Sequence, residues 1–167
     1  MLYIMRSIDL NADLGEGFGA YECGRDEDLM RYITSANVAC GWHAGDPIVM
    51  RRTVECARRR GVRVGAHPGY PDLLGFGRRD MGVSPEEARQ YVIYQVSALA
   101  GFAKASGVSL QHVKLHGAFY NTAMRDQDLS RAVADAIAEM DCGLIVAALP
   151  GSALIEAALR AGLKVAR

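Results

Sequence analysis

Carboxylates, histidines and a lysine follow the ends of short apolar runs in this chain. Asp9, Asn11, Asp13 and Glu16 come after the first run, Asn37 and His43 lie in and after the second, His67 ends the third, and Lys114 and His116 end the fourth. If these runs are parallel strands, their carboxyl ends meet at one edge of a sheet, where βα-repeat proteins bind ligands. The pattern therefore predicts an enzyme site built from residues far apart in the sequence.

The acidic group after the first run has the spacing of a strand end. Asp9, Asn11 and Asp13 alternate, so they face the same side while the chain stays extended. Carboxylates there could act as a base, bind a cation or orient a histidine, or they could form a turn that caps the next element. A functional role is favoured over a turn cap, because clustered carboxylates repel one another unless a partner offsets their charge.

Three of the four histidines, His43, His67 and His116, fall at predicted strand ends, and at least two of them are expected in the site. His112 begins its strand at the opposite end and is expected to be structural. Lys114 lies inside the same strand, where a lysine must be paired or functional because burying an unpaired ammonium is costly.

The segment 68–79 is rich in glycine, proline and aromatic residues. Loops of this length are usually functional or disordered, and the aromatic residues argue against disorder. Arg78 and Arg79 could each hold a carboxylate or phosphate in a bidentate manner, or they could be a solvated pair. Cys40 could be a nucleophile beside His43, although a small core residue is the favoured interpretation.

Strands are predicted at 3–10, 37–40, 62–66, 112–115, 144–149 and 163–166, alternating with helices at 26–33, 47–60, 85–106, 129–140 and 152–161. Asp46 before Pro47 and the sequence beginning at Ser84 are the clearest helix starts. A βα repeat predicts a parallel sheet with right-handed crossovers. No G-x-G-x-x-G follows the first strand, so the polar strand ends favour a distorted barrel over a dinucleotide-binding fold. The chain ends on a strand, which predicts an open fold, an absent segment or completion by another chain.

The composition predicts one domain over residues 1–167 and excludes several classes of protein. Lys plus Arg number 19 and Asp plus Glu number 19, with no basic stripe of the kind that nucleic-acid readers carry. No apolar run approaches the roughly 18 residues of a membrane span, and no signal-peptide layout is visible. Four cysteines without a C-x-x-C pair favour free thiols and a cytoplasmic protein.

Five segments resemble the LamB/YcsF family: DLNADLGEGFG (9–19), SANVACGWHAGDP (35–47), GAHPGYPD (65–72), GFGRR (75–79) and HVKLHGAFYN (112–121). The resemblance covers essentially the whole chain. Leu115 stands where the family usually has proline, and Trp42 where it often has phenylalanine. Family members run well past residue 167, so we expect the barrel to be incomplete at the C-terminus of this chain.

The resemblance implies a distorted β/α barrel related to carbohydrate deacetylases. It also implies ATP-dependent opening of 5-oxoproline to L-glutamate together with partner subunits B and C. The chain contains no G-x-x-x-x-G-K-[ST] loop, so ATP is expected as a co-substrate of the complex rather than as a ligand of a Walker site here. If the partners activate the lactam by phosphorylation, this chain need only add water.

The predicted catalytic residues are Asp9, Asp13, His43, His67, Lys114 and His116. An acid from Asp9 or Asp13, or a histidine oriented by one, would be the general base, while Lys114 and a protonated His67 or His116 would stabilise the developing oxyanion. The predicted substrate-binding residues are Asn11, Glu16, Asn37, Tyr70, Arg78, Arg79 and Asn121, with the long loop as a lid.

Two other functions stay open at the level of sequence. A metal-dependent deacetylase could hold Zn²⁺ with Asp13, His67 and His116, leaving a position for water, but no H-x-x-x-H pair fixes such a geometry, so no metal ligand is assigned. A non-catalytic scaffold could bind 5-oxoproline for its partners. With any of these functions, the chain could form a homo-oligomer.

Overall fold

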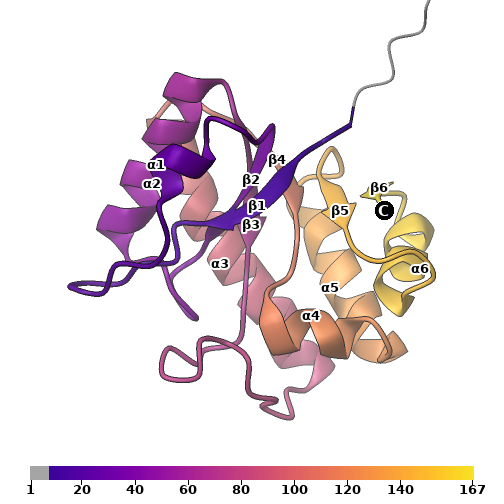
Figure 1. Cartoon of the computed structure of the whole chain (residues 1–167). Helices are drawn as coiled ribbons and strands as arrows, with labels where there is room; N and C mark the ends of the chain where they lie inside the picture. The colour runs from indigo at the N-terminus through magenta and orange to yellow at the C-terminus, as the bar shows by residue number, and fades with distance from the viewer. Residues whose placement is uncertain (1–7) are drawn as a thin grey trace, which may run out of the picture.

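The computed structural model describes residues 8–167, which form one parallel sheet covered by helices (Figure 1). The strands are β1 (Asn11–Leu14), β2 (Ser35–Ala39), β3 (Arg63–His67), β4 (Leu110–Val113), β5 (Ile145–Ala147) and β6 (Lys164–Ala166). The helices are α1 (Asp26–Leu29), α2 (Pro47–Arg60), α3 (Pro85–Ala105), α4 (Gly117–Ala123), α5 (Gln127–Met140) and α6 (Ala153–Arg160). The α/β class predicted from the sequence is confirmed.

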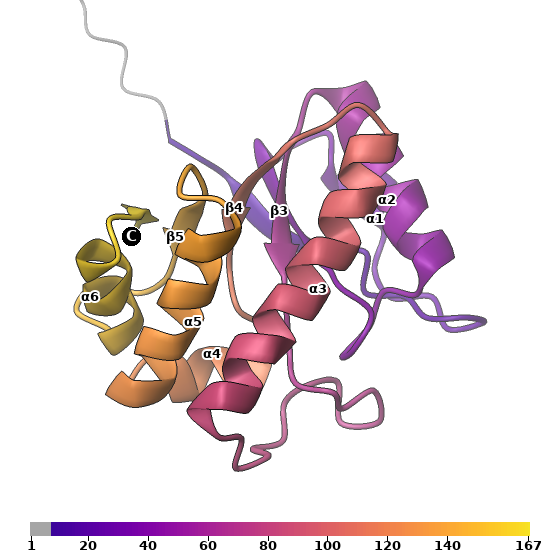
Figure 2. The same ribbon diagram turned by 180° about the vertical axis from the view of Figure 1, so that it is seen from behind.

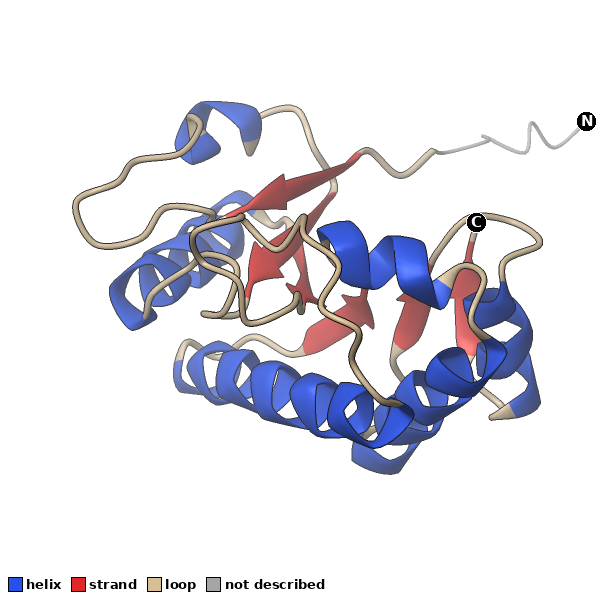
Figure 3. Cartoon of the chain, turned by 90° about the horizontal axis from the view of Figure 1, so that it is seen from below, coloured by secondary structure: helices blue, strands red, loops and turns tan. Residues whose placement is uncertain are grey.

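The six strands are parallel and follow one another in sequence order from β1 to β6. Helices α3 and α5 lie behind the sheet in Figure 1 and in front of it in Figure 2, while α2 and α6 flank its two ends. The view from below shows the long helices along one side of the row of strands (Figure 3). A doubly wound sheet reverses its strand order, whereas an order without reversal is the winding of a β/α barrel. Within residues 8–167 the sheet is open, with β1 and β6 at its edges.

The first strand differs from its predicted position. Residues 3–7 of the predicted strand lie outside the described residues, residues 8–10 precede the strand, and β1 begins at Asn11. The second strand starts two residues early, at Ser35, and all five of its residues are buried. Polar Ser35 and Asn37 belong to this buried strand because their side chains find partners on β1, which periodicity alone does not reveal.

Several helix ends follow the local sequence. The Asp46 carboxylate accepts hydrogen bonds from the backbone N–H groups of Ile48 and Val49 at 2.7 and 3.1 Å, and Gly61 ends α2 with φ +69°. Ser84 and Glu87 form the capping box that begins α3. Helix α1 is shorter than predicted, and α4 was not predicted.

The buried apolar side chains form one cluster between the sheet and the helices. Val38, Val64 and Val113 contribute from the strands, and Val54 and Leu99 contribute from α2 and α3. The opposite face of the sheet, called the inner face below, carries hydrogen-bonded polar side chains from β1, β2 and β4, namely Asn11, Asp13, Asn37 and His112. None of the helices within residues 8–167 combines the length and apolar character of a membrane span.

Candidate functional site

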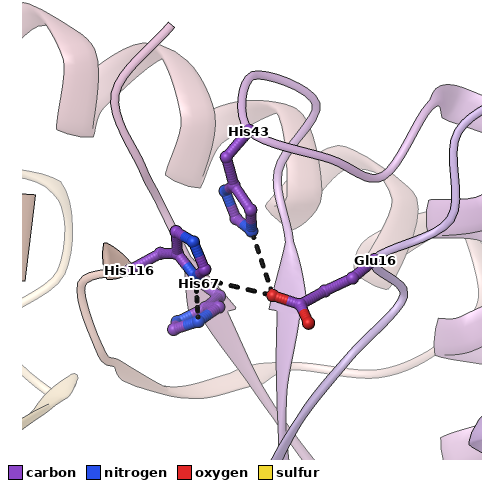
Figure 4. A group of neighbouring side chains, drawn as sticks. All are labelled: Glu16, His43, His67 and His116. Atoms are coloured by element: carbon purple, nitrogen blue, oxygen red, sulfur yellow. Dashed lines mark hydrogen bonds and ion pairs between the residues drawn. The ribbon is translucent and has the colours of Figure 1, made fainter. Parts of the chain in front are cut away.

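A cluster of three histidines and a glutamate lies at the carboxyl ends of four neighbouring strands (Figure 4). Glu16 follows β1, His43 follows β2, His67 ends β3 and His116 follows β4. Each side chain offers one nitrogen or oxygen atom, and these four atoms lie within 4.8 Å of one another. The histidines are buried and Glu16 is partly buried, so the parallel strands do bring together these distant residues.

Two backbone carbonyl groups orient His67 and His116. The Nδ1 atom of His67 lies 2.6 Å from the carbonyl oxygen of Lys114, and Nε2 of His116 lies 2.8 Å from that of Phe76. Because a carbonyl oxygen only accepts, each of these ring nitrogens carries a hydrogen and donates it. The other two nitrogens, His67 Nε2 and His116 Nδ1, face each other at 3.0 Å.

His43 covers the cluster and contacts Glu16. Its ring stacks on that of His116, with centroids 3.7 Å apart and planes 3° from parallel. Its Nε2 lies 3.3 Å from Glu16 Oε1, while its buried Nδ1 has no hydrogen-bond partner among the described residues. A neutral His43 therefore carries its hydrogen on Nε2 and donates it to Glu16, which lies 3.5 Å from His116 Nδ1.

Two glycines allow the loop after β3 to close over these rings. A Cβ atom added at Gly69 would lie 2.7 Å from Nδ1 of His43. One added at Gly77 would lie 2.8 Å from the Cβ of His43 and 2.9 Å from Cδ2 of His116. Side chains at these positions would push the histidines apart, so the glycines determine how tightly the cluster packs.

Asp13 joins Lys114 to the histidine cluster. Its Oδ1 accepts hydrogen bonds from Lys114 Nζ and Asn37 Nδ2, both at 2.7 Å, and its Oδ2 lies 3.4 Å from His67 Nε2. Burial opposes its ionisation, but the hydrogen bond and charge of His67 when that ring is protonated, and those of Lys114, outweigh burial and hold the pKa of Asp13 well below its usual value. A carboxylate held so firmly as an anion is a poor general base, so Asp13 fits an orienting and charge-pairing role.

Burial also governs the histidines. It lowers the pKa of His43, and together with the nearby His43 and His67 it lowers the pKa of His116 to about 4. A protonated His116 is therefore disfavoured at neutral pH as an oxyanion stabiliser. For Glu16, burial opposes ionisation, but the hydrogen bond from His43, and the charges of the neighbouring histidines whenever these are protonated, lower its pKa.

The remaining inner-face residues form a hydrogen-bonded ladder. Asn37 Nδ2 donates to Asn11 Oδ1 at 2.5 Å, and Asn11 Nδ2 donates to Ser35 Oγ at 2.8 Å. The Ser35 hydroxyl donates to Asp9 at 2.6 Å. Burial opposes ionisation of Asp9, but the hydrogen bonds from Ser35 and its neighbour outweigh burial and lower its pKa. Asp9 thus lies at the far end of the ladder from the histidines and makes none of the contacts within their cluster.

His112 belongs to this ladder, which the sequence interpretation missed. Its Nε2–H donates to Asn37 Oδ1 at 2.7 Å from inside β4. The available signal was its spacing two residues before Lys114, which places both on one strand face. Asp9, Asn11, His112 and Lys114 line an open hollow of about 990 Å³ on the inner face of the sheet.

Four residues predicted to bind substrate are not members of the histidine–glutamate cluster. Tyr70 is buried in the core with its ring 4.8 Å from that of Phe119, and Asn121 is exposed on α4. Arg79 forms a bidentate ion pair with Asp72 inside its own loop, and Arg78 lies 5.5 Å above the ring of Phe76. The composition of the loop did not reveal that Arg78 and Arg79 have partners within it.

The converging ligand group differs from the Asp13, His67 and His116 set considered for a zinc enzyme, whereas the favoured interpretation of Cys40 as a core residue is confirmed. The group whose ligand atoms converge contains Glu16 and His43 beside His67 and His116, and does not contain Asp13. Burial raises the pKa of the Cys40 thiol to about 12, so this side chain is a core residue rather than a nucleophile.

Comparison with known proteins identifies the family of the chain. The LamB/YcsF family model matches residues 8–167. The chain is 62% identical to the A subunit of 5-oxoprolinase from Pyrococcus abyssi, over 95% of its own length and 62% of the relative's. It is 60% identical to the Bacillus subtilis protein of the same name, over 97% of its length and 63% of the relative's.

A solved structure extends the agreement to three dimensions. The lactam utilization protein from Thermus thermophilus superposes with a TM-score of 0.94 at 49% identity, over 96% of this chain and 65% of that one. The chain thus spans just under two thirds of the length of these relatives. With a family model matched over nearly all of its residues, the chain belongs to the LamB/YcsF family.

Proposed function

We propose that this chain provides the catalytic site of a 5-oxoprolinase A subunit, which opens the lactam of 5-oxoproline to L-glutamate. The observation that carries the proposal is the buried histidine–glutamate cluster beside the Asp13–Lys114 pair, in a chain about 60% identical to relatives of that name. Because the chain spans under two thirds of those relatives, the activity is proposed for the family-length protein with partner subunits B and C and with ATP as co-substrate.

The hollow on the inner face is the proposed binding site for the lactam. Asn11 and Lys114 line it, and both contact the ladder that leads to Asp13. Lys114 Nζ, held by Asp13, would stabilise the negative charge that develops on the lactam oxygen when water attacks its carbonyl carbon. Amide groups of Asn11 and Asn37 offer hydrogen bonds of the kind that orient a polar cyclic substrate.

The cluster, when no metal ion occupies it, is the proposed position of the attacking water. The free nitrogens of His67 and His116 and the carboxylate of Glu16 all present acceptor atoms toward the same small volume. Such a volume holds a water molecule by its hydrogens and favours loss of a proton from it. Attack forms the new C–O bond as the cluster accepts a proton from the water, and collapse of the tetrahedral intermediate breaks the C–N bond as that proton passes to the ring nitrogen.

A reconstituted assay tests this function. The family-length version of the chain, with subunits B and C, would be assayed for 5-oxoproline-dependent ATP hydrolysis and glutamate release. We expect Asp13→Asn and His116→Ala each to lower the rate by at least ~100-fold. Arg131→Gln, which changes an exposed side chain on α5, serves as the control. Wild-type rates in both site variants would refute the assignment, and 5-oxoproline binding without any effect on turnover would favour the scaffold.

The cluster also favours a second candidate, a metal-dependent deacetylase or amide hydrolase. Two histidines and one carboxylate are a known ligand set of catalytic zinc. The assay that separates the two functions is release of acetate from N-acetylated sugars without ATP or partner subunits. Turnover there, together with no 5-oxoproline-dependent activity, would favour the second candidate.

A further inference from the structure

Hydrogen bonds to backbone carbonyls prepare two of the histidines for a metal ion. Histidines that bind metals in proteins almost always donate their second ring N–H to a carboxylate or a backbone carbonyl. His67 does so to the carbonyl of Lys114, and His116 to that of Phe76. His43 has no such partner for Nδ1 among the described residues. The two oriented rings therefore differ from the third.

The free donor atoms have the separations of a coordination shell. His67 Nε2 and His116 Nδ1 are 3.0 Å apart, and His116 Nδ1 is 3.5 Å from Glu16 Oε1. Donor atoms bound at about 2.05 Å to a tetrahedral ion lie about 3.3 Å from one another. With both rings neutral, two nitrogen lone pairs and a carboxylate oxygen face each other away from solvent, which a cation between them would relieve.

Ring orientation decides which histidines can share one ion. An imidazole binds a metal with the ion close to the plane of its ring. The planes of His67 and His116 are 89° apart, so one point can lie in both planes, whereas His43 is stacked parallel to His116 at 3.7 Å. As the side chains stand, His43 and His116 cannot share an ion.

We propose that His67 Nε2, His116 Nδ1 and the Glu16 carboxylate bind one divalent transition-metal ion, while His43 positions Glu16 by donating a hydrogen bond. Two imidazoles and a carboxylate suit Zn²⁺ and its neighbours in the first transition series. When bound, such an ion supplies water activation by lowering the pKa of its water ligand. The role of the ion in lactam opening rests on the proposed function, but its binding does not.

Metal binding to the 167-residue chain tests the proposal. The chain is purified without a polyhistidine tag, stripped with a chelator, shown to be folded by circular dichroism, and titrated with Co²⁺ by absorption and with Zn²⁺ by calorimetry. We expect one ion per chain, with d–d bands typical of nitrogen–oxygen coordination. His67→Ala, His116→Ala and Glu16→Gln are expected to weaken binding by ~100-fold or more.

Three further variants test the ligand set itself. His43→Gln and Asp13→Asn are expected to weaken binding by less than ~10-fold, and His112→Gln, which changes the fourth histidine, is expected to leave it unaltered. No stoichiometric binding in the folded wild-type chain would overturn the proposal. So would a loss in His43→Gln or Asp13→Asn as large as that in His67→Ala. If a ligand variant fails to fold, His→Asn or Glu→Asp replaces it, and the wild-type titration still decides.

The same experiment separates this inference from the proposed function. Stoichiometric metal binding in a protein that shows no 5-oxoproline-dependent turnover would retain the metal site and remove the lactamase role. Full turnover by the family-length protein after complete metal removal would retain the lactamase role and exclude the ion from it.

Discussion

At the scale of single residues, the site separates positive charge from acceptor atoms. Lys114 and Asp13 form an ion pair that is 28% and 36% exposed at the two side chains, beside the hollow. The His67 and His116 acceptor atoms lie behind it, in side chains that are at most 4% exposed. A substrate in the hollow would therefore meet the cation first, with the water-binding volume beyond it.

Lys114→Met tests this arrangement. Removing one group that stabilises a developing oxyanion typically costs 10²–10³ in kcat, so we expect a loss of ~100-fold or more in kcat with a smaller change in KM. Asp13 keeps its bond from Asn37, so the variant is expected to fold. Steady-state kinetics of the reconstituted complex measure the split, with Lys104→Met on α3 as the matched lysine control. A change confined to KM would assign Lys114 to substrate binding alone.

At the scale of elements, β3 and β4 pack through a glycine. A Cβ atom added at Gly65 would lie 2.1 Å from Nε2 of His112, a distance at which the ring must move. The β3–β4 register also shifts between Val64 and Gly65. The ladder from His112 to Asn37 therefore requires a glycine at this position of β3.

Gly65→Ala is expected to destabilise the protein by about 1–3 kcal/mol, because it overpacks a buried contact. Gly101→Ala on α3 is the matched control: nothing lies within 4 Å of its added Cβ, and alanine is expected to stabilise the helix by about 0.5–1 kcal/mol. Chemical denaturation measures both effects. The double variant Gly65→Ala with His112→Ala is expected to recover part of the loss, and strict additivity would contradict the contact.

The sequence predicted helices and strands better than it predicted which side chains contact one another. The ends of α2 and the start of α3 depend on residues close in sequence, such as Asp46, Gly61 and Ser84, so the local pattern was sufficient. The first strand was misplaced because its residues alternate in polarity and their partners lie on β2. Likewise Arg79 was predicted to bind substrate, since no local pattern reveals its pairing with Asp72.

The candidate site could be predicted in outline from the order of strands and helices. Parallel strand ends must meet at one edge, so His43, His67 and His116 could be grouped before any distance was known. Their division of roles could not be predicted, because it depends on the carbonyl groups of Phe76 and Lys114. Every residue has a backbone carbonyl, so the residue types do not show which carbonyls will accept these hydrogen bonds.

At the scale of the whole molecule, buried neutral histidines make stability depend on pH. Burial lowers the pKa of His112 to about 4, and its usual value is 6.5. Below pH 6.5, His112 therefore binds a proton in the unfolded chain, whereas in the folded chain it binds one only near pH 4. The contribution of neutral His112 to the free energy of unfolding is fully present above pH 6.5 and is lost as the pH falls from 6.5 toward 4.

We expect the unfolding free energy of the wild type to fall across this interval, with His112 accounting for up to about 3 kcal/mol. His112→Gln, which cannot titrate, is expected to lose less over the same interval, even if it is less stable at pH 7. Urea denaturation of both proteins at several pH values between 7 and 4 measures the difference in slope. Equal slopes would show that His112 does not remain neutral in the folded state.

The Phe76 carbonyl has a consequence for how molecules reach the site. The loop after β3 was expected to act as a lid, yet its Phe76 carbonyl accepts the Nε2–H of His116, and its Asp72 and Arg79 are paired within it. Swinging this loop away would disassemble the histidine cluster that a lid should only uncover. We therefore expect substrate to reach the cluster from the side of the Lys114–Asp13 pair, whose side chains are partly exposed. A ligand bound beside Lys114 and Asp13 would block that route without displacing His43, His67 or His116.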